Sequence, residues 1–223
     1  LWLDFGKDNY ASVTWDNTPN NEVISIGWMS NWLYAQDVPT VQWRSSMTIP
    51  RKLKLVKDAD GYTIISSPIA EIGGYFKETV IKKDIVFENK TRLLKNGEVD
   101  LTKSVIDIEL TDLKEDIYSF SITNDRGDVV KFGIDNTSNM LFLDRSKSGI
   151  VDFSDKFSNE ITKVPLGHTY QDCKFQLVLD KTSIEIFFND GEKAITEIFF
   201  PTRPFQEIWV ESSNKDAKVK VLK

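Results

Sequence analysis

Apolar and polar residues alternate with a period of two along most of the chain. This period predicts β-strands, because successive side chains of a strand point to opposite faces of its sheet. The turn pairs Asp60–Gly61, Asn96–Gly97 and Asp190–Gly191 separate several of these runs. Helical periodicity is weak, and only Ala70–Lys77, after Pro68, is expected to form a short turn or helix. The predicted strands are Glu22–Met29, Tyr62–Ser66, Ser104–Leu110, Ile117–Thr123, Val129–Asp135, Met140–Arg145, Lys174–Asp180, Ser183–Asn189, Ala194–Phe200 and Glu207–Ser212.

The clearest hairpin signal is the sequence SIEIFFNDGEKAITEIFF, in which two strand-like runs flank Asp190–Gly191. Aspartate and glycine adopt the positive φ angles of a tight turn at little cost. Many short strands at this spacing are typical of an all-β protein, either a sandwich or part of a propeller. The alternating Ile, Val, Phe and Leu positions of residues 79–223 are suited to a core between two sheets.

Composition divides the chain into three parts. Residues 1–67 contain five of the six tryptophans, residues 68–78 resemble a connector, and residues 79–223 have an ordinary β pattern. The strands of the first part are too few to be stable alone. We therefore expect residues 79–223, or chain that is not in this sequence, to cover them.

Composition and charge exclude several classes of protein. Hydrophobic residues make up 40% of the chain, which is enough for a core and argues against global disorder. The formal net charge of −6 and the lack of a strongly basic run argue against a nucleic-acid partner. In Arg51–Lys57 the lysines alternate with apolar residues, which predicts one wet strand face. No apolar run is long enough to predict a transmembrane helix.

The single cysteine and the single histidine limit the possible chemistry. Cys173 cannot form an intrachain disulfide, and we expect it to be a buried hydrophobe. His168 follows a loop signal, and no nucleophile-elbow motif accompanies it. One histidine and one cysteine leave no metal site and no Cys–His dyad to predict, so no cofactor is expected.

The tryptophan-rich first part suits a carbohydrate-binding surface. An aromatic ring packs on the C–H bonds of a sugar while polar neighbours bond its hydroxyls. Trp32 is the strongest candidate, because Ser30, Asn31 and Tyr34 flank it in a predicted loop. Packing in the core is instead the expectation for Trp2, Trp15 and Trp28.

Two aspartates in this first part raise the question of glycoside hydrolysis. Retaining enzymes use two carboxyl groups about 5 Å apart. Asp4 and Asp8 would share one face of a strand, about 13 Å apart, unless the chain turns at Gly6. We therefore expect them to orient a ligand or to stabilise the fold rather than to catalyse.

Several motifs together resemble glycoside hydrolase family 32, the invertases, levanases, inulinases and other β-fructosidases. The resemblance covers nearly the whole chain, although Asn9 stands where the family has an aromatic residue. Its motifs are DFGKDNYAS (Asp4–Ser12), GWMSNWLYA (Gly27–Ala35), PT…WR…MTIPRxL (Pro39–Leu53), LDRSKSG (Leu143–Gly149) and LDKTSIEIFFNDGE (Leu179–Glu192), with Phe200–Pro201.

The resemblance implies a five-bladed propeller followed by a β-sandwich. Residues 1–67 would be the fifth blade, residues 68–78 the linker and residues 79–223 the sandwich. Blades one to four would lie outside this chain, which begins without an initiator Met or a signal peptide. The family's catalytic motifs, Trp-x-Asn-Asp-Pro-Asn-Gly, Arg-Asp-Pro and Glu-Cys, do not occur in this sequence. We therefore expect a retaining fructosidase as the parent protein and assign no catalytic residue here.

Substrate-binding residues follow from the same resemblance. Trp32 and Asn31 match the Asn-Trp-x-Tyr motif that lines the terminal-fructose pocket. Asp4 and Lys7 match residues near the neighbouring sugar subsite in part of the family. The expected partners are a fructan or sucrose-type carbohydrate, the missing propeller, and a second copy of the chain through the exposed blade face.

Two alternatives remain open at this point. The chain could be a lectin-like module that binds fructan through its sandwich, or a purely structural scaffold that braces the propeller. The parent protein is expected to be secreted, attached to the cell surface or periplasmic.

Overall fold

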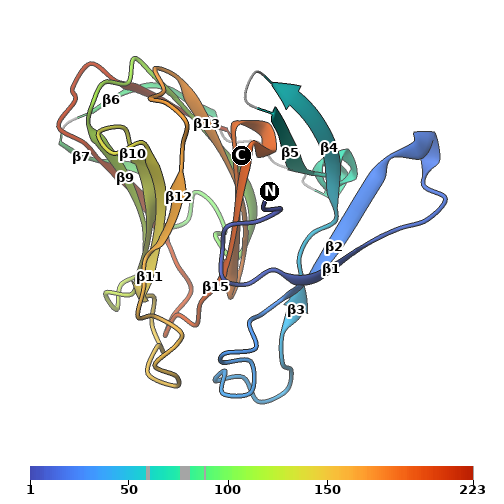
Figure 1. The fold of residues 1–223 in the computed structure, drawn as a ribbon. Coiled ribbons are helices and arrows are strands. Elements are labelled where there is room, and N and C mark those ends of the chain that lie inside the picture. The colour runs from blue at the N-terminus through green and yellow to red at the C-terminus, as the bar shows by residue number, and fades with distance from the viewer. Residues whose placement is uncertain (59–60, 76–80, 88, 223) are drawn as a thin grey trace.

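The computed structural model describes residues 1–58, 61–75, 81–87 and 89–222. These residues form an all-β protein in which one antiparallel sheet lies beside a sandwich of two others (Figure 1). We call the first sheet the blade. The N-terminal segment runs between the blade and the sandwich (Figure 1). The fold class predicted from the sequence, a two-sheet sandwich preceded by a propeller fragment, is confirmed.

The blade follows the order β1-β2-β4-β5, with β3 paired to β2. Its two hairpins, β1–β2 and β4–β5, extend away from the sandwich in different directions (Figure 1). One short 3₁₀ helix, η1 (Pro19–Asn21), connects β1 to β2, and a second, η2 (Ala70–Tyr75), follows β5. The strands are β1 (Tyr10–Thr14), β2 (Val23–Met29), β3 (Ser46–Met47), β4 (Arg51–Asp58) and β5 (Gly61–Pro68).

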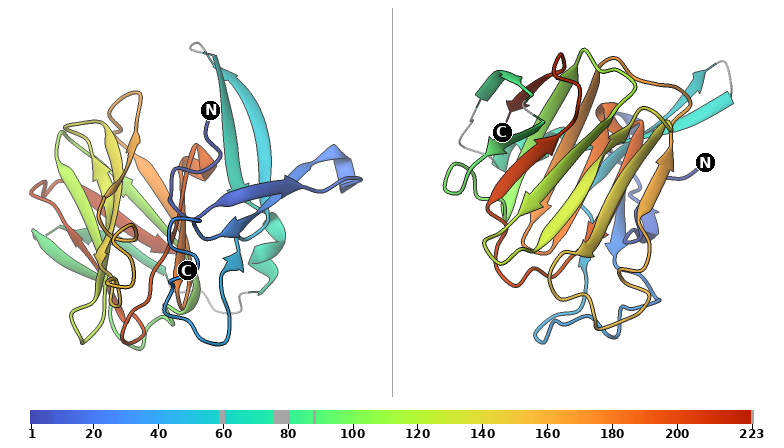
Figure 2. Two further views of the ribbon diagram at one scale, coloured as in Figure 1. Left: turned by 60° about the horizontal axis from the view of Figure 1, so that its bottom comes forward. Right: turned by 90° about the vertical axis from the view of Figure 1, so that its left-hand side faces the viewer.

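The sandwich consists of an outer sheet, ordered β12-β11-β10-β9-β16-β7, and an inner sheet, ordered β15-β14-β13-β8-β17-β6. The right-hand view of Figure 2 looks onto the outer sheet, and the blade lies behind the inner one. The outer strands are β7 (Lys90–Leu94), β9 (Ile117–Thr123), β10 (Val129–Asp135), β11 (Met140–Lys147), β12 (Thr162–Pro165) and β16 (Glu207–Glu211). The inner strands are β6 (Ile81–Val86), β8 (Lys103–Thr111), β13 (Cys173–Asp180), β14 (Ser183–Phe188), β15 (Lys193–Ile198) and β17 (Lys218–Leu222).

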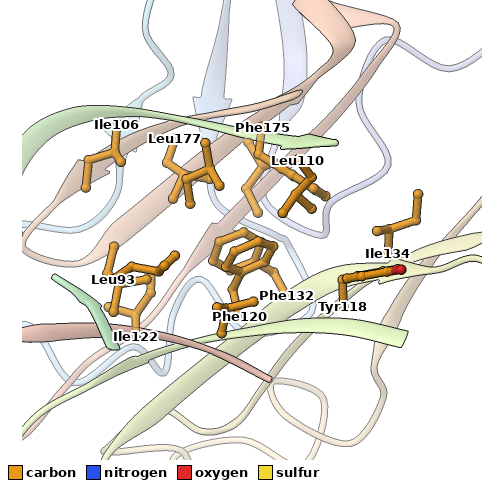
Figure 3. Packing of buried hydrophobic residues seen from close by; sticks show 14 of the residues in the cluster. Leu93, Ile106, Leu110, Tyr118, Phe120, Ile122, Phe132, Ile134, Phe175 and Leu177 are labelled. Carbon is orange, nitrogen blue, oxygen red and sulfur yellow. The ribbon is translucent and has the colours of Figure 1, made fainter. Parts of the chain in front are cut away.

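The core fills the space between the two sandwich sheets. Side chains of β8 and β13, such as Ile106 and Leu177, face those of β7, β9 and β10 (Figure 3). At its centre the rings of Phe120 and Phe132 stack at 5.1 Å, and Phe175 meets both edge-on. Such aromatic pairs contribute about 0.5–1.5 kcal/mol each beyond the area that they bury.

Strand β14 is buried along its whole length, although its neighbour β13 alternates between buried and half-buried residues. The reason is that the core covers one face of β14 and the blade covers the other, so both sets of alternating side chains leave water. The predicted hairpin between β14 and β15 is confirmed. Its turn, η3 (Asn189–Gly191), has positive φ at all three residues.

Most predicted elements are present, with boundaries that differ by a few residues. The connector begins with η2, while its residues 76–78 lie outside the described residues, as does Asp60 of one predicted turn. The pattern did not predict β1, β3, β6, β7, β12 or β17. The core positions expected of Trp2 and Trp15 are wrong, because these side chains are 74% and 47% exposed.

At Gly191 the backbone of the sandwich comes very close to the backbone of the blade. Its φ is +97°, and a Cβ built on it would lie 2.3 Å from the carbonyl oxygen of Ser66 in β5. Gly97 has a similar φ of +86°, with no atom within 4 Å of its Cβ position. We expect Gly191→Ala to lower the free energy of unfolding by clearly more than Gly97→Ala, whose left-handed backbone alone costs about 1–2 kcal/mol. Urea unfolding of both variants measures the difference, and equal losses would show that the approach of the blade adds no constraint.

Candidate functional site

The segment from Asp4 to Asp8 lies along β15 of the inner sheet. The amide of Phe5 donates to the carbonyl of Ala194 at 2.8 Å, and the amide of Asp8 donates to the carbonyl of Thr196 at 3.1 Å. Between them, a Cβ on Gly6 would lie 2.1 Å from the carbonyl oxygen of Thr196. Glycine is therefore required here by the close approach of two backbones.

Asp4 belongs to a buried ion cluster that joins the blade to the sandwich. One guanidinium nitrogen of Arg51, in β4, contacts Asp4 at 2.6 Å, and the other contacts Glu185, in β14, at 2.6 Å. The amide and hydroxyl of Thr196 also donate to the Asp4 carboxylate, at 2.9 and 2.6 Å. Burial raises the pKa of Glu185, and the charge of Arg51 opposes this shift.

Asp8 belongs to a second buried cluster, centred on Arg145 of β11. The Arg145 guanidinium donates to Asp8, contacts Glu197 of β15 at 2.8 Å and donates to the Tyr34 hydroxyl at 2.7 Å. The Tyr34 hydroxyl in turn donates to Asp8 at 2.6 Å. Burial and the charge of Asp8 raise the pKa of Tyr34. The ring of Phe157 covers the guanidinium, with its centroid 3.9 Å from Cζ.

The hydrogen bonds and ion pairs of these two clusters fix the orientation of the Asp4 and Asp8 carboxylates. Both carboxylates face the sandwich, accept hydrogen bonds from arginine and backbone groups, and are nearly inaccessible to solvent. Asp4 therefore offers a sugar no exposed acceptor, and it is not among the residues that line the open cleft between the blade and the sandwich. Lys52, Lys54 and Lys57 are exposed, as predicted for the lysines of this run, whereas Arg51 is buried against the inner sheet.

Trp32 lies in the turn after β2 and is 65% exposed. Its ring packs against Trp28 with centroids 4.9 Å apart, and Tyr10 meets Trp28 edge-on at 6.2 Å. The indole N–H of Trp28 donates to the Ser45 hydroxyl, which fixes this middle ring. Tyr10, Trp28 and Trp32 form what we call the aromatic row. Trp28 thus packs within this row rather than in the core expected for it.

Lys7 and Asn31 line an open cleft of about 310 Å³ between the blade and the sandwich. The Asn31 side-chain amide donates to the carbonyl of Lys7 at 2.8 Å, and the Lys7 ammonium donates to the carbonyl of Glu160 at 2.7 Å. Burial lowers the pKa of Lys7, while the nearby carboxylates of Glu197 and Glu160 oppose this. The other side of the cleft is formed by Lys156, Asn159 and Glu160, from the loop before β12.

The structure thus brings together only some of the predicted residues. Lys7 and Asn31 share the cleft, and Trp32 belongs to the aromatic row, next to Asn31 in the same turn. Sequence reasoning missed the cluster residues Arg145, Glu185 and Glu197. Charged residues inside strongly apolar strand runs, as in SIEIFF and AITEIFF, were the available signal, since such charges are buried only when they are paired.

Other candidates for chemistry lie apart from the cleft. Cys173 is buried, as expected, and burial raises the pKa of its thiol. His168 is an exposed loop residue stacked on Tyr170. Within the described part of the chain, no group of three or more His, Cys, Asp or Glu side chains is arranged to hold a metal ion. The helices described there are all too short or too polar to cross a membrane.

Comparison with known protein families gives two matches that follow each other along the chain. The N-terminal domain model of glycosyl hydrolases family 32 matches residues 1–68, and the C-terminal model of the same family matches residues 77–223. The chain belongs to glycosyl hydrolase family 32. The predicted family is therefore confirmed, and four motifs of the resemblance meet at the two ion clusters through Asp4, Arg51, Arg145 and Glu185.

Among curated family 32 relatives, a levanase from Bacillus subtilis is 32% identical in an alignment 230 residues long that covers 100% of this chain and 33% of the levanase. An extracellular exo-inulinase from Aspergillus awamori is 26% identical over 90% of this chain and 38% of its own length. The chain therefore spans about a third of the length of the relatives that it matches.

Solved structures show the same family 32 fold. The exo-inulinase from Aspergillus awamori superposes with a TM-score of 0.82 at 24% identity, over 100% of this chain and 44% of that one. A β-fructofuranosidase from Schwanniomyces occidentalis, complexed with fructosyl-erythritol, gives a TM-score of 0.80 at 23% identity, over 99% of this chain and 48% of that one.

Arg145 provides a direct test of the interface. We expect Arg145→Met to lower the free energy of unfolding by about 3–5 kcal/mol, because it leaves buried Asp8 and Glu197 without their counter-charge. Arg203→Met is the matched control, since its pair with Asp125 is half-exposed and contributes at most about 1 kcal/mol. Urea unfolding measures both, and comparable small losses would contradict the structural role of the cluster.

Proposed function

We propose that this chain is part of a retaining β-fructosidase that acts on fructans or on sucrose. The observation that carries the proposal is the ordered match of both family 32 models to one chain. Relatives named levanase and exo-inulinase support fructan as the substrate class. In this proposal residues 1–67 are the fifth propeller blade, residues 68–78 the linker and residues 79–223 the sandwich. The end of β5 at Pro68 supports this division.

The chain supplies one wall of the substrate pocket. Trp32 offers an exposed ring face to the C–H bonds of a fructosyl unit, and Trp28 supports that ring from behind. Asn31 precedes Trp32 in the same turn and lines the cleft together with Lys7, and both carry polar groups for sugar hydroxyls. Asp4 is assigned a supporting role, because its hydrogen bonds hold the segment that carries Lys7.

The chemical step is assigned to parts of the parent protein that are not in this chain. A glycosidase needs one carboxylic acid and one carboxylate at the scissile bond. Asp4 and Asp8 are both engaged with arginines in buried clusters, which supports assigning no catalytic residue here. The isolated chain is therefore proposed to bind sugar without hydrolysing it.

Titration of the isolated chain with fructan oligosaccharides tests this function. Trp32→Ala is expected to weaken binding about tenfold, the equivalent of about 1.4 kcal/mol. Trp209→Ala is the control, because Trp209 lies in β16 of the outer sheet and reports on a lectin-like site in the sandwich. Fructose release assayed in the same samples should not exceed that of heat-inactivated protein. Binding lost in the Trp209 variant alone would favour the lectin-like alternative.

The partner proposed for the blade is the rest of the propeller. Large apolar side chains are exposed on the blade and its N-terminal segment, among them Trp2, Tyr10, Val13, Trp15, Val23 and Met47. Surfaces of this kind are covered by other parts of a protein or by partners. Relatives named extracellular support secretion of the parent. In this proposal its destination is the medium, the cell surface or the periplasm.

Self-association of the isolated chain is the corresponding prediction. With the propeller absent, the exposed apolar side chains and unpaired strand edges of the blade are expected to pair between copies. Light scattering should show a mean mass that rises with protein concentration. Trp15→Ser is expected to reduce this rise, whereas Ile161→Ser, at an exposed sandwich position, is expected to leave it unchanged. A constant monomeric mass for the unmodified chain would contradict the prediction.

A further inference from the structure

We infer that Glu197 takes up a proton when the chain folds, so that mild acid strengthens the contact between the N-terminal segment and the sandwich. Glu197 lies in β15 of the inner sheet and contacts Arg145 and Thr162, which belong to β11 and β12 of the outer sheet. The amide of Lys7, in the N-terminal segment, also donates to Glu197, at 3.3 Å. A change of charge on this one carboxyl group therefore acts on all three parts at once.

The cluster around Arg145 contains more negative than positive groups. Asp8 and Glu197 both contact Nη1 of Arg145, which is the one cation within ion-pair distance of either carboxylate among the described residues. Tyr34, the other partner of Asp8, is a neutral hydroxyl. If both carboxylates were ionised, a negative charge would remain where the three charged side chains are at most 1% exposed. Such a buried charge is costly, and a carboxyl group removes it by binding a proton.

The hydrogen bonds of the cluster satisfy Asp8 fully and Glu197 only in part. The Asp8 carboxylate accepts from the Tyr34 hydroxyl, from Arg145 and from the amide of Ile198. Both hydrogens of Arg145 Nη1 are used, because one bonds Asp8 and the other bonds the carbonyl of Ile198 at 2.9 Å. Oε2 of Glu197 lies 2.8 Å from this nitrogen but accepts no hydrogen bond from it.

Oε2 of Glu197 is accordingly where the proton binds. Oε1 accepts from the Thr162 hydroxyl at 2.5 Å and from the amide of Lys7, whereas no group in the described part of the chain donates to the buried Oε2. An ionised oxygen in that position loses the hydrogen bonds that water would give it. A proton on Oε2 removes this loss, and the Asp8 carboxylate, which contacts the same guanidinium nitrogen, lies near it as an acceptor.

The surroundings of Glu197 act on its pKa in opposing directions. Burial raises the pKa of Glu197, and the charge of Arg145 opposes this shift. The charge of Asp8 raises the pKa further, whereas the Thr162 hydrogen bond and the charge of Lys7 lower it. The Lys7 ammonium donates to the Glu160 carbonyl rather than to Glu197. The net shift of the pKa is upward, in agreement with the count of hydrogen bonds.

An upward shift determines the sign of the pH effect. A glutamate in an unfolded chain has a pKa of about 4.3. Below that pH Glu197 is protonated in both states and its contribution to stability is complete, and the contribution is lost as the pH rises through the raised pKa of the folded state. For Asp116 and Asp135, hydrogen bonds outweigh burial and lower the pKa. Their contributions are lost only as the pH falls, below the ordinary aspartate pKa of about 3.9.

Urea unfolding at a series of pH values tests the inference. Between about pH 4.5 and about pH 7, the unfolding constant of the unmodified chain is expected to rise with pH, by up to about tenfold per pH unit for each proton released. Glu197→Gln has no carboxyl group to protonate, so its unfolding constant should rise less steeply. The remaining rise includes Glu185, whose pKa burial also raises. Glu109→Gln is the matched control, because its pair with Lys220 is partly exposed, and it should keep the slope of the unmodified chain.

A second measurement tests the inference even if Glu197→Gln fails to fold. In the folded chain, labelled isotopically at the glutamate carboxyl carbons, the nuclear magnetic resonance signal of Glu197 is expected to titrate above the ordinary glutamate range. Thr162→Val removes a donor to the ionised form, so it should move the midpoint of this signal further upward and thereby assign it.

Three results would each overturn the inference. The first is an equal slope for the unmodified chain and Glu197→Gln. The second is a set of glutamate signals that all titrate near about 4.3. The third is a raised signal whose midpoint Thr162→Val leaves unchanged, since that signal belongs to a glutamate outside the Arg145 cluster.

Discussion

Two buried arginines hold this molecule together, and each depends on carboxylates from a different part of the chain. Arg51 of the blade reaches Glu185 of the sandwich, and Arg145 of the sandwich reaches Asp8 of the N-terminal segment. Removing such charges from water is costly unless they are paired, so these contacts favour the observed arrangement of blade and sandwich over arrangements that would separate the pairs. Apolar packing alone would allow many more, because the hydrophobic effect has no direction.

The ion cluster around Arg145 also fixes the geometry of the candidate site. Tyr34, two residues beyond Trp32, is held between Asp8 and Arg145, so the turn that carries the exposed tryptophan is fixed to the sandwich through a hydroxyl. Phe157 lies on the same guanidinium and holds the opposite wall of the cleft. The sandwich thereby takes part in shaping a surface that the blade alone could not define.

Much of the fold could be predicted from the sequence, because core strands carry their own signal. The limits of β9 and β10 match the prediction, since residues such as Phe120 and Phe132 alternate with polar ones. Strand β1 has five exposed residues and no such alternation, and its pairing with β2 alone defines it. The candidate site was harder to predict from the sequence than the fold. Trp32 lies in a recognisable motif. Arg51 and Glu185, however, are 134 residues apart in sequence, and no local sequence pattern predicts that they form an ion pair.

Strand β14 is buried on both faces and so belongs to two interiors at once. Its core-facing residues belong to the sandwich, while Glu185 and Phe187 on its other face are covered by Arg51 of the blade. The two compositional parts therefore share one strand as common interior. Separating the sandwich from the blade would therefore open a second, charged interior to water.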